Sequence, residues 1–308
     1  MTMTAFGRQG ARLRIEALMA VGGYDAPGAV MLSDFGDGAS MQSSEAAKGE
    51  TAEGVTAGLE RSTSVTPDGA ASACYRARSD RPGREGSWAK IGWEFPEPLD
   101  LSAHRGLGVW VHGDARGEVL NFQVRSPESV ALGIGEHYVV VDFEGWRYFE
   151  LAEFEGQRCG DYVWPYSRDL YGIFRESVNY AAVGTLSVWY NNLPPGEDVE
   201  CHVGPIKALP LVKTPVRNPS ITIGGDQIRF PVDIEPGTYL EVAATDECTL
   251  YGPDGAALQD VAPEGRAPCV EAGGNHVRFA SDVTDGERPR ARVTVITDGD
   301  PLPDVHCP

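Results

Sequence analysis

Apolar and polar residues alternate along short segments of the chain, a pattern with the two-residue period of β-strands. The clearest alternation begins at Lys90, where Ile91, Trp93 and Phe95 point to one side. β-branched and aromatic residues dominate these segments, and Gly, Pro, Asp or Glu clusters bound them, as is typical of strands between turns. The strands predicted before residue 208 lie at 13–21, 90–95, 107–112, 119–125, 137–143, 146–151 and 185–191.

Beyond residue 220 the predicted strands are shorter, and turns such as GGD, EPGT, GPDG and AGGN separate them. Just before them, the segment 208–219 contains three prolines, which is typical of a stiff linker. The spacing of these short strands is that of a small Ig-like sandwich. They lie at 221–223, 227–232, 239–243, 248–251, 276–279 and 290–296.

The whole pattern therefore predicts an all-β chain of two domains, in keeping with a length of 308 residues. Residues 1–29 are expected to form an N-terminal strand or extension, and residues 30–210 a β-sandwich. A proline-rich linker at 211–219 leads to an Ig-like β-sandwich with an extended tail at 220–308. Residues 36–88 have weak periodicity, so no strand boundaries are predicted there.

The net charge of the chain excludes some classes of binding partner. The formal net charge is −19, so nucleic-acid backbones and insertion into anionic membranes are not expected. No segment has the roughly 20 apolar residues of a membrane helix, and Glu16 interrupts the short apolar run near the N-terminus. We interpret that run as a strand; the protein would be secreted or displayed on a cell surface if a leader had been removed, and cytoplasmic otherwise.

The sequence contains six cysteines, which can be disulfide-bonded or free thiols. No CxxC or other close ligand pair occurs, so the sequence does not predict a zinc site. Cys248 with Cys269, and Cys159 with Cys201, are possible disulfide pairs within the two domains. Buried free thiols are the alternative.

Strand alternation also predicts a binding face. In the segment 119–125, Leu120 and Phe122 point one way, so the polar side chains between them point the other way. An aromatic ring can cover the apolar face of a sugar while amides and Arg reach its hydroxyl groups. If the strands share one sheet, a carbohydrate would bind there; an ordinary solvated face is the alternative. The candidate ligand-binding residues are Trp110, His112, Asn121, Gln123, Arg125, Tyr148, Trp189 and Asn191.

Catalytic and metal-binding motifs are sparse. The sequence has no GxSxG, HExxH, P-loop or GxGxxG motif, and its abundant carboxylates form no distinctive pair. The segment LSDFGDG is more informative, because Asp34 and Asp37 supply hard oxygen ligands suited to a structural Ca²⁺. The alternative is an ordinary Asp/Gly turn.

A family resemblance follows from three segments: KIGWEFPEPLDLSAHRGLGVWVHGD, LNFQVRS and FEGWRYFEL. They resemble the galactose-binding-like jelly rolls that accompany carbohydrate-active enzymes, in which a PLDLS turn precedes a strand like the one ending at Asp114. The resemblance covers roughly residues 30–210. It implies a non-catalytic carbohydrate-binding or packing module, often with a structural calcium ion near its first strand, a position that Asp34 and Asp37 match loosely.

Three functions remain open at this stage. The first is non-catalytic glycan binding through the aromatic and polar face of the first sandwich. The second is a polysaccharide-active enzyme, either a glycoside hydrolase or a lyase. The third is a structural or assembly protein whose sandwiches contact only other proteins.

Overall fold

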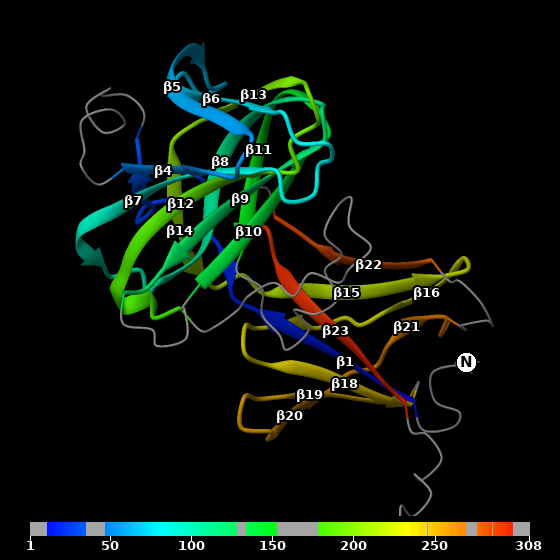
Figure 1. Cartoon of the computed structure of the whole chain (residues 1–308). Helices are drawn as coiled ribbons and strands as arrows, with labels where there is room; N and C mark the ends of the chain where they lie inside the picture. The colour runs from blue at the N-terminus through cyan, green and yellow to red at the C-terminus, as the bar shows by residue number, and fades with distance from the viewer. Residues whose placement is uncertain are drawn as a thin grey trace, which may run out of the picture. The chain divides into compact units, whose positions relative to one another are not determined.

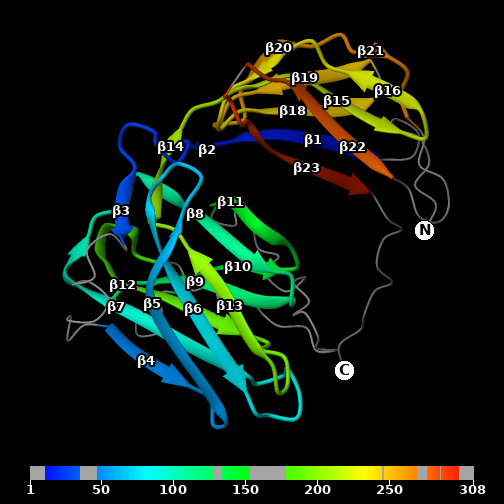
Figure 2. The same cartoon turned by 90° about the horizontal axis from the view of Figure 1, so that it is seen from above.

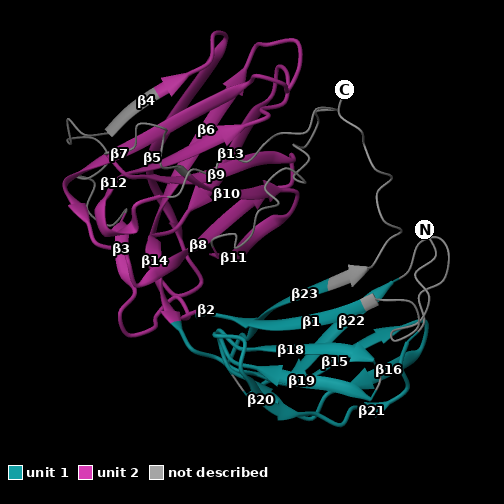
Figure 3. Cartoon of the chain, turned by 90° about the horizontal axis from the view of Figure 1, so that it is seen from below, with its two compact units in different colours: residues 1–20, 212–308 teal, residues 21–211 magenta. Residues whose placement is uncertain are grey.

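The computed structural model describes residues 11–34, 47–127, 134–152, 178–244, 246–268, 276–284 and 286–297. Within them the regular structure is β-strand, apart from the 3₁₀ turn η2 (Tyr180–Ala182). The prediction of an all-β chain is confirmed. The chain divides into two compact units (Figure 3): unit 1 is formed by residues 1–20 and 212–308, and unit 2 by residues 21–211.

One sheet of unit 2, the β9–β12 sheet, has the strand order β10-β9-β12-β7-β4 (Figure 1). All of its neighbouring strands are antiparallel. Its strands are β4 (Ala47–Thr51), β7 (Trp88–Leu99), β9 (Glu118–Arg125), β10 (Ile134–Val141) and β12 (Val183–Asn191).

The other sheet of unit 2, the β8–β13 sheet, has the order β2-β14-β8-β13-β6-β5, and β11 and β3 pair with β8 and β14 (Figure 2). Its strands are β2 (Ala20–Val21), β3 (Val30–Ser33), β5 (Val55–Val65), β6 (Ala71–Ser79), β8 (His104–Asp114), β11 (Glu144–Ala152), β13 (Asp198–Val203) and β14 (Ile206–Val212).

The core of unit 2 lies between these two sheets, which makes the unit a β-sandwich. Val109 and Val111 of β8 are fully buried, and so are Leu120 and Phe122 of β9. All four belong to one hydrophobic cluster. The alternation in the sequence explains this arrangement, because every second residue of each strand must face the same layer.

Unit 1 is a second two-sheet arrangement with its own core. Its sheets have the orders β20-β19-β18-β1-β23 and β17-β15-β16-β21, and β22 pairs with β15. Leu13, Ile15, Phe230 and Ile234 are among its buried residues. The strands are β1 (Ala11–Leu18), β15 (Val216–Ile223), β16 (Asp226–Arg229), β17 (Asp233–Ile234), β18 (Tyr239–Ala244), β19 (Glu247–Tyr251), β20 (Ala257–Asp260), β21 (Glu264–Gly265), β22 (Val277–Asp282) and β23 (Arg290–Thr297).

The predicted domain boundaries need two corrections. The predicted N-terminal segment 1–29 is divided between the two units: β1 pairs with β18 and β23 and belongs to unit 1, whereas unit 2 begins at residue 21. The segment 211–219 is not a separate linker, because β14 runs to Val212 and β15 begins at Val216. Strand pairing over such sequence distances leaves no local mark in the sequence. The Ig-like character of unit 1 stays a prediction.

The described cysteines are free, buried thiols: Cys74, Cys201 and Cys248. Cys159 and Cys269, the partners considered for two of them, lie outside the described residues. The described residues also contain no helix long and apolar enough to cross a membrane.

Candidate functional site

The predicted ligand-binding residues lie on two different sheets of unit 2. The condition that these strands share one sheet is therefore not met, because alternation shows which side of a strand faces the core but not which sheet the strand joins. The β8–β13 sheet carries Trp110, His112 and Tyr148, whereas the β9–β12 sheet carries Asn121, Gln123, Arg125, Trp189 and Asn191.

A row of large side chains crosses the outer face of the β9–β12 sheet. The strand register places Tyr138, Asn121, Trp189, Lys90 and Glu50 opposite one another in that order, from β10 to β4. Such cross-strand neighbours lie close enough to interact. The row therefore brings two aromatic rings, an amide and two opposite charges onto one line across the sheet.

A hydrogen-bonded network centred on Glu136 occupies the β9–β10 side of this face. The amides of Asn121 and Gln123 donate to Oε1 of Glu136 at 2.9 and 3.0 Å. The hydroxyl of Tyr138 donates to Oε2 at 2.6 Å, and Arg125 Nε donates to Oε1 of Gln123 at 2.9 Å. Both oxygens of the carboxylate are thus held by neighbours.

Two tryptophans adjoin that network on β12 and β7. The rings of Trp88 and Trp189 lie 5.1 Å apart, and Lys90 Nζ lies 5.3 Å from the centre of the Trp189 ring. Lys90 also lies 3.8 Å from a carboxylate oxygen of Glu50. The Nε1–H of Trp189 is buried and has no hydrogen-bond acceptor among the described residues.

Burial divides the residues of this face by role. Asn121 and Gln123 are only 4% and 3% exposed, so they position Glu136 rather than meet a ligand. Asn191 donates to the backbone carbonyl of Val119 at 3.2 Å, which likewise makes it a structural residue. The half-buried side chains that can meet a ligand are Trp88, Lys90, Arg125, Glu136, Tyr138 and Trp189.

Four of those six residues were not predicted as ligand-binding residues: Trp88, Lys90, Glu136 and Tyr138. Glu136 and Tyr138 continue the alternation of β10, whose apolar set is Val139 and Val141, and that pattern alone points them away from the core. The prediction began this strand at residue 137, past Glu136.

The outer face of the β8–β13 sheet carries a different set of side chains. Trp110 and Tyr148 are directly opposite on β8 and β11, with ring centres 5.4 Å apart. His112 lies between Trp146 and His202, at 5.4 and 5.3 Å from their ring centres. This face is therefore built of rings in tilted and edge-to-face contact rather than of an amide network.

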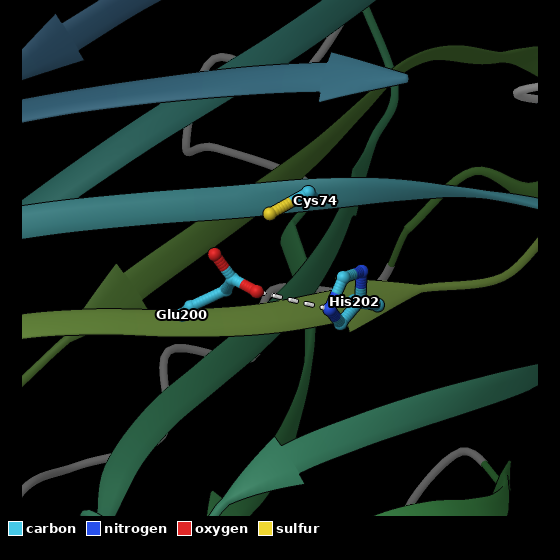
Figure 4. Close-up of side chains that lie close together, drawn as sticks. All are labelled: Cys74, Glu200 and His202. Carbon is cyan, nitrogen blue, oxygen red and sulfur yellow. Dashed lines mark ion pairs between the residues drawn. The ribbon is translucent and has the colours of Figure 1, made fainter. Parts of the chain in front are cut away.

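Cys74, Glu200 and His202 lie together beside those rings (Figure 4). His202 Nε2 is 3.1 Å from Glu200 Oε1, and its Nδ1 is 2.8 Å from Ser62 Oγ. Burial lowers the pKa of His202, an effect that Glu200 opposes. Burial, reinforced by Glu200, raises the pKa of the Cys74 thiol to about 12.

This cluster was not predicted, because Cys74 is distant in the sequence from Glu200 and His202. The available pattern was Glu200-x-His202: two residues apart on a strand, both side chains emerge on the same face. Cys74 lies directly opposite His202 on β6, a pairing that only the sheet reveals.

A buried carboxyl group lies on the core side of β9. Glu118 is fully buried, and neither of its oxygens has a hydrogen-bond partner among the described residues. Burial raises its pKa to about 8, and Asp114 adds to this effect. A group so placed is neutral in mildly acidic solution and strains the core once it ionises.

The two aspartates predicted to bind calcium follow the strand β3 in the sequence. Asp34 is exposed and follows β3, and Asp37 lies outside the described residues. A Ca²⁺ ion at these two aspartates remains a prediction.

No protein-family model and no curated protein sequence matches the chain. Several solved structures do. A family 11 carbohydrate-binding module from Clostridium thermocellum, solved with a β-1,3-1,4-mixed-linked tetrasaccharide, matches with a TM-score of 0.40 and 15% identity, over 60% of this chain and 98% of the module. An exo-β-agarase matches with a TM-score of 0.39 and 12% identity, over 59% of this chain and 25% of the agarase.

The enzymatically active domain of tailspike protein 4 from bacteriophage CBA120 matches with a TM-score of 0.35 and 8% identity, over 59% of this chain and 22% of that chain. Carbohydrate-binding modules, the class that the sequence resembles, are thus among the matching structures. Function is inferred below from the side chains of the site, because these TM-scores are low.

Proposed function

We propose that the protein binds a neutral glycan, without chemical conversion, through the outer face of the β9–β12 sheet. The observation that carries the proposal is the juxtaposition of the Trp88–Trp189 pair with the network around Glu136. An aromatic surface next to fixed donors and acceptors matches a sugar ring, which has an apolar C–H face and a hydroxyl-bearing edge.

The electrostatics favour a neutral ligand over an anionic one. The chain carries a net charge of −19, whereas the two cations that the structure describes on this face are already engaged: Lys90 by Glu50 and Arg125 by Gln123. A polyanion would meet the repulsive field of the whole chain without gaining an unengaged cation at this site.

The hydrogen bonding of Glu136 favours binding over catalysis. A glycoside hydrolase of the common type needs two carboxyl groups flanking the scissile bond, one of them able to deliver a proton. On this face the oxygens of Glu136 accept hydrogen bonds from two amides and a phenol, which suits a fixed acceptor.

The test begins with a glycan-binding screen of the full chain, run with and without a calcium chelator. A polysaccharide hit is then titrated by calorimetry against the wild type and against Trp189→Ala. Loss of the aromatic surface is expected to weaken binding at least about tenfold, or 1.4 kcal/mol. Trp110→Ala on the other sheet is the matched control and should bind like the wild type.

The outcomes separate the three functions. Binding that Trp189→Ala leaves unchanged would reject this face as the site. Release of reducing ends or of unsaturated products from the polysaccharide would replace the proposal with an enzyme. Absence of binding to every glycan in the screen, together with self-association of the chain in sedimentation, would favour an assembly protein. Loss of binding on chelation would support the calcium ion predicted at Asp34 and Asp37.

A further inference from the structure

The outer face of the β8–β13 sheet gathers three different metal-ligating side chains from two strands. Glu200 and His202 lie on β13, and Cys74 lies on the neighbouring strand β6, directly opposite His202. One ligand atom from each residue can be chosen so that all three lie within 4.8 Å of one another. Figure 4 shows the three side chains clustered over the two adjacent strands, with the ion pair between Glu200 and His202 marked.

Two of these three side chains are each hydrogen-bonded to a further residue outside the cluster. Ser62 Oγ lies 2.8 Å from Nδ1 of His202, which leaves Nε2 facing the cluster. Arg76 Nε donates to Oε2 of Glu200 at 2.5 Å, which leaves Oε1 facing the cluster. Hydrogen bonds from residues that do not themselves bind the metal orient metal ligands in proteins. Ser62 on β5 and Arg76 on β6 make such bonds to the two residues on β13.

We propose that Cys74, Glu200 and His202 bind a zinc ion on this face. A thiolate, an imidazole and a carboxylate together form a donor set typical of Zn²⁺, whereas Ca²⁺ and Mg²⁺ prefer oxygen ligands alone. Three protein ligands leave a fourth tetrahedral position for water or another small ligand.

The distances suit such an ion. Zinc–ligand bonds of about 2.0–2.2 Å at a tetrahedral angle separate a nitrogen and an oxygen ligand by about 3.4 Å. Nε2 of His202 and Oε1 of Glu200 are 3.1 Å apart, so a small movement admits the ion. The corresponding sulfur–nitrogen separation is about 3.6 Å. Because the ligand atoms lie within 4.8 Å of one another, side-chain rotation can bring Cys74 Sγ into place.

The experiment titrates the full chain with zinc after removal of metals, in competition with a chromophoric chelator. The wild type is expected to bind one zinc ion per chain at this site. Cys74→Ser and His202→Asn should each weaken that binding at least tenfold. Ser62→Ala, which removes only the support of Nδ1, should weaken it about tenfold as well.

Matched controls use the other unit of the chain. Cys248→Ser removes a buried free thiol and His276→Asn an exposed imidazole, and neither should change the zinc stoichiometry or affinity. Cobalt serves as a second readout, because a thiolate ligand adds a charge-transfer absorption band that Cys74→Ser should abolish. Circular dichroism of each metal-free variant establishes that it is folded.

Two results would overturn the proposal. One is a wild-type chain that takes up no zinc at micromolar concentrations. The other is zinc binding that survives the double substitution of Cys74 and His202 unchanged, which would place the metal among the other acidic residues. A cobalt complex without the thiolate band would contradict the ligand role of Cys74. None of these outcomes bears on glycan binding, which is proposed for the opposite sheet.

Discussion

Each outer face of unit 2 carries a glutamate that is hydrogen-bonded to neighbours, but the neighbours of the two glutamates differ in burial. Glu136 on the β9–β12 sheet accepts hydrogen bonds from two buried amides, Asn121 and Gln123. Glu200 on the β8–β13 sheet accepts from Arg76, whose side chain is 58% exposed. The difference teaches that the partners of a carboxylate decide how firmly it is held: the buried amides fix Glu136 as an acceptor on its face, whereas the exposed Arg76 engages one oxygen of Glu200 and leaves the other directed toward His202.

The largest expected effect concerns Glu118, the carboxyl between the two sheets. Its pKa is raised from 4.5 to about 8, chiefly by burial, so the folded state keeps a proton that the unfolded state loses. The free energy of unfolding should therefore fall as the pH rises from about 4.5 to about 8, and level off above. Glu118→Gln should remove this loss, and raise the free energy of unfolding at pH 9 by on the order of 3 kcal/mol.

Urea unfolding of Glu118→Gln and the wild type at pH 5 and pH 9 measures this effect. The two proteins should differ little at pH 5, where Glu118 is neutral when folded. An equal difference at both pH values would mean that the substitution acts through packing instead of through charge.

The next effect concerns Glu136. Glu136→Leu removes the acceptor of two buried amides, so it should lower the free energy of unfolding by about 2–3 kcal/mol. Glu136→Gln keeps one acceptor oxygen and should lose less. Chemical denaturation of the three proteins at pH 7 gives the comparison. A stability of Glu136→Leu within about 0.5 kcal/mol of the wild type would contradict the structural role of the network.

A smaller effect is expected from Trp88, which supports Trp189 through their ring contact. Trp88→Ala should weaken glycan binding about fivefold, or roughly 1 kcal/mol, because an aromatic pair contributes about that much beyond its area. Trp146→Ala, in the ring cluster of the opposite sheet, is the control. Titration calorimetry with the same polysaccharide measures the affinity of both variants. Equal losses of affinity would contradict the assignment of glycan binding to the β9–β12 sheet alone.

The smallest effect concerns Glu200 without metal. Glu200→Gln should change the free energy of unfolding by less than about 1 kcal/mol, since its partner Arg76 is exposed to solvent. Thermal unfolding of the metal-free chain measures it. A loss as large as that of Glu136→Leu would show that both carboxylates are structural and that the contrast between the faces is wrong.

Much of the fold could be predicted from periodicity, because alternation depends only on neighbouring residues. Periodicity identified the core-facing sides of β8 and β9, and it placed Asn121 and Gln123 on the side of β9 that faces away from the core. It could not show that Trp110 and Trp189 lie on different sheets, since sheet membership depends on pairing between distant segments. Nor could it show that Asn121 and Gln123 are buried on the outer side of β9, which only the neighbouring strands decide.

The placement of β1 has a consequence for how the protein is made. On the ribosome, residues 21–211 emerge before β23, so unit 2 can fold while unit 1 still lacks a strand of its sheet. The N-terminal strand must stay unpaired during that time, or pair only with β18 once residues 239–244 have emerged. A nascent chain is therefore exposed to aggregation at Ala11–Leu18 until the strand β23 has emerged.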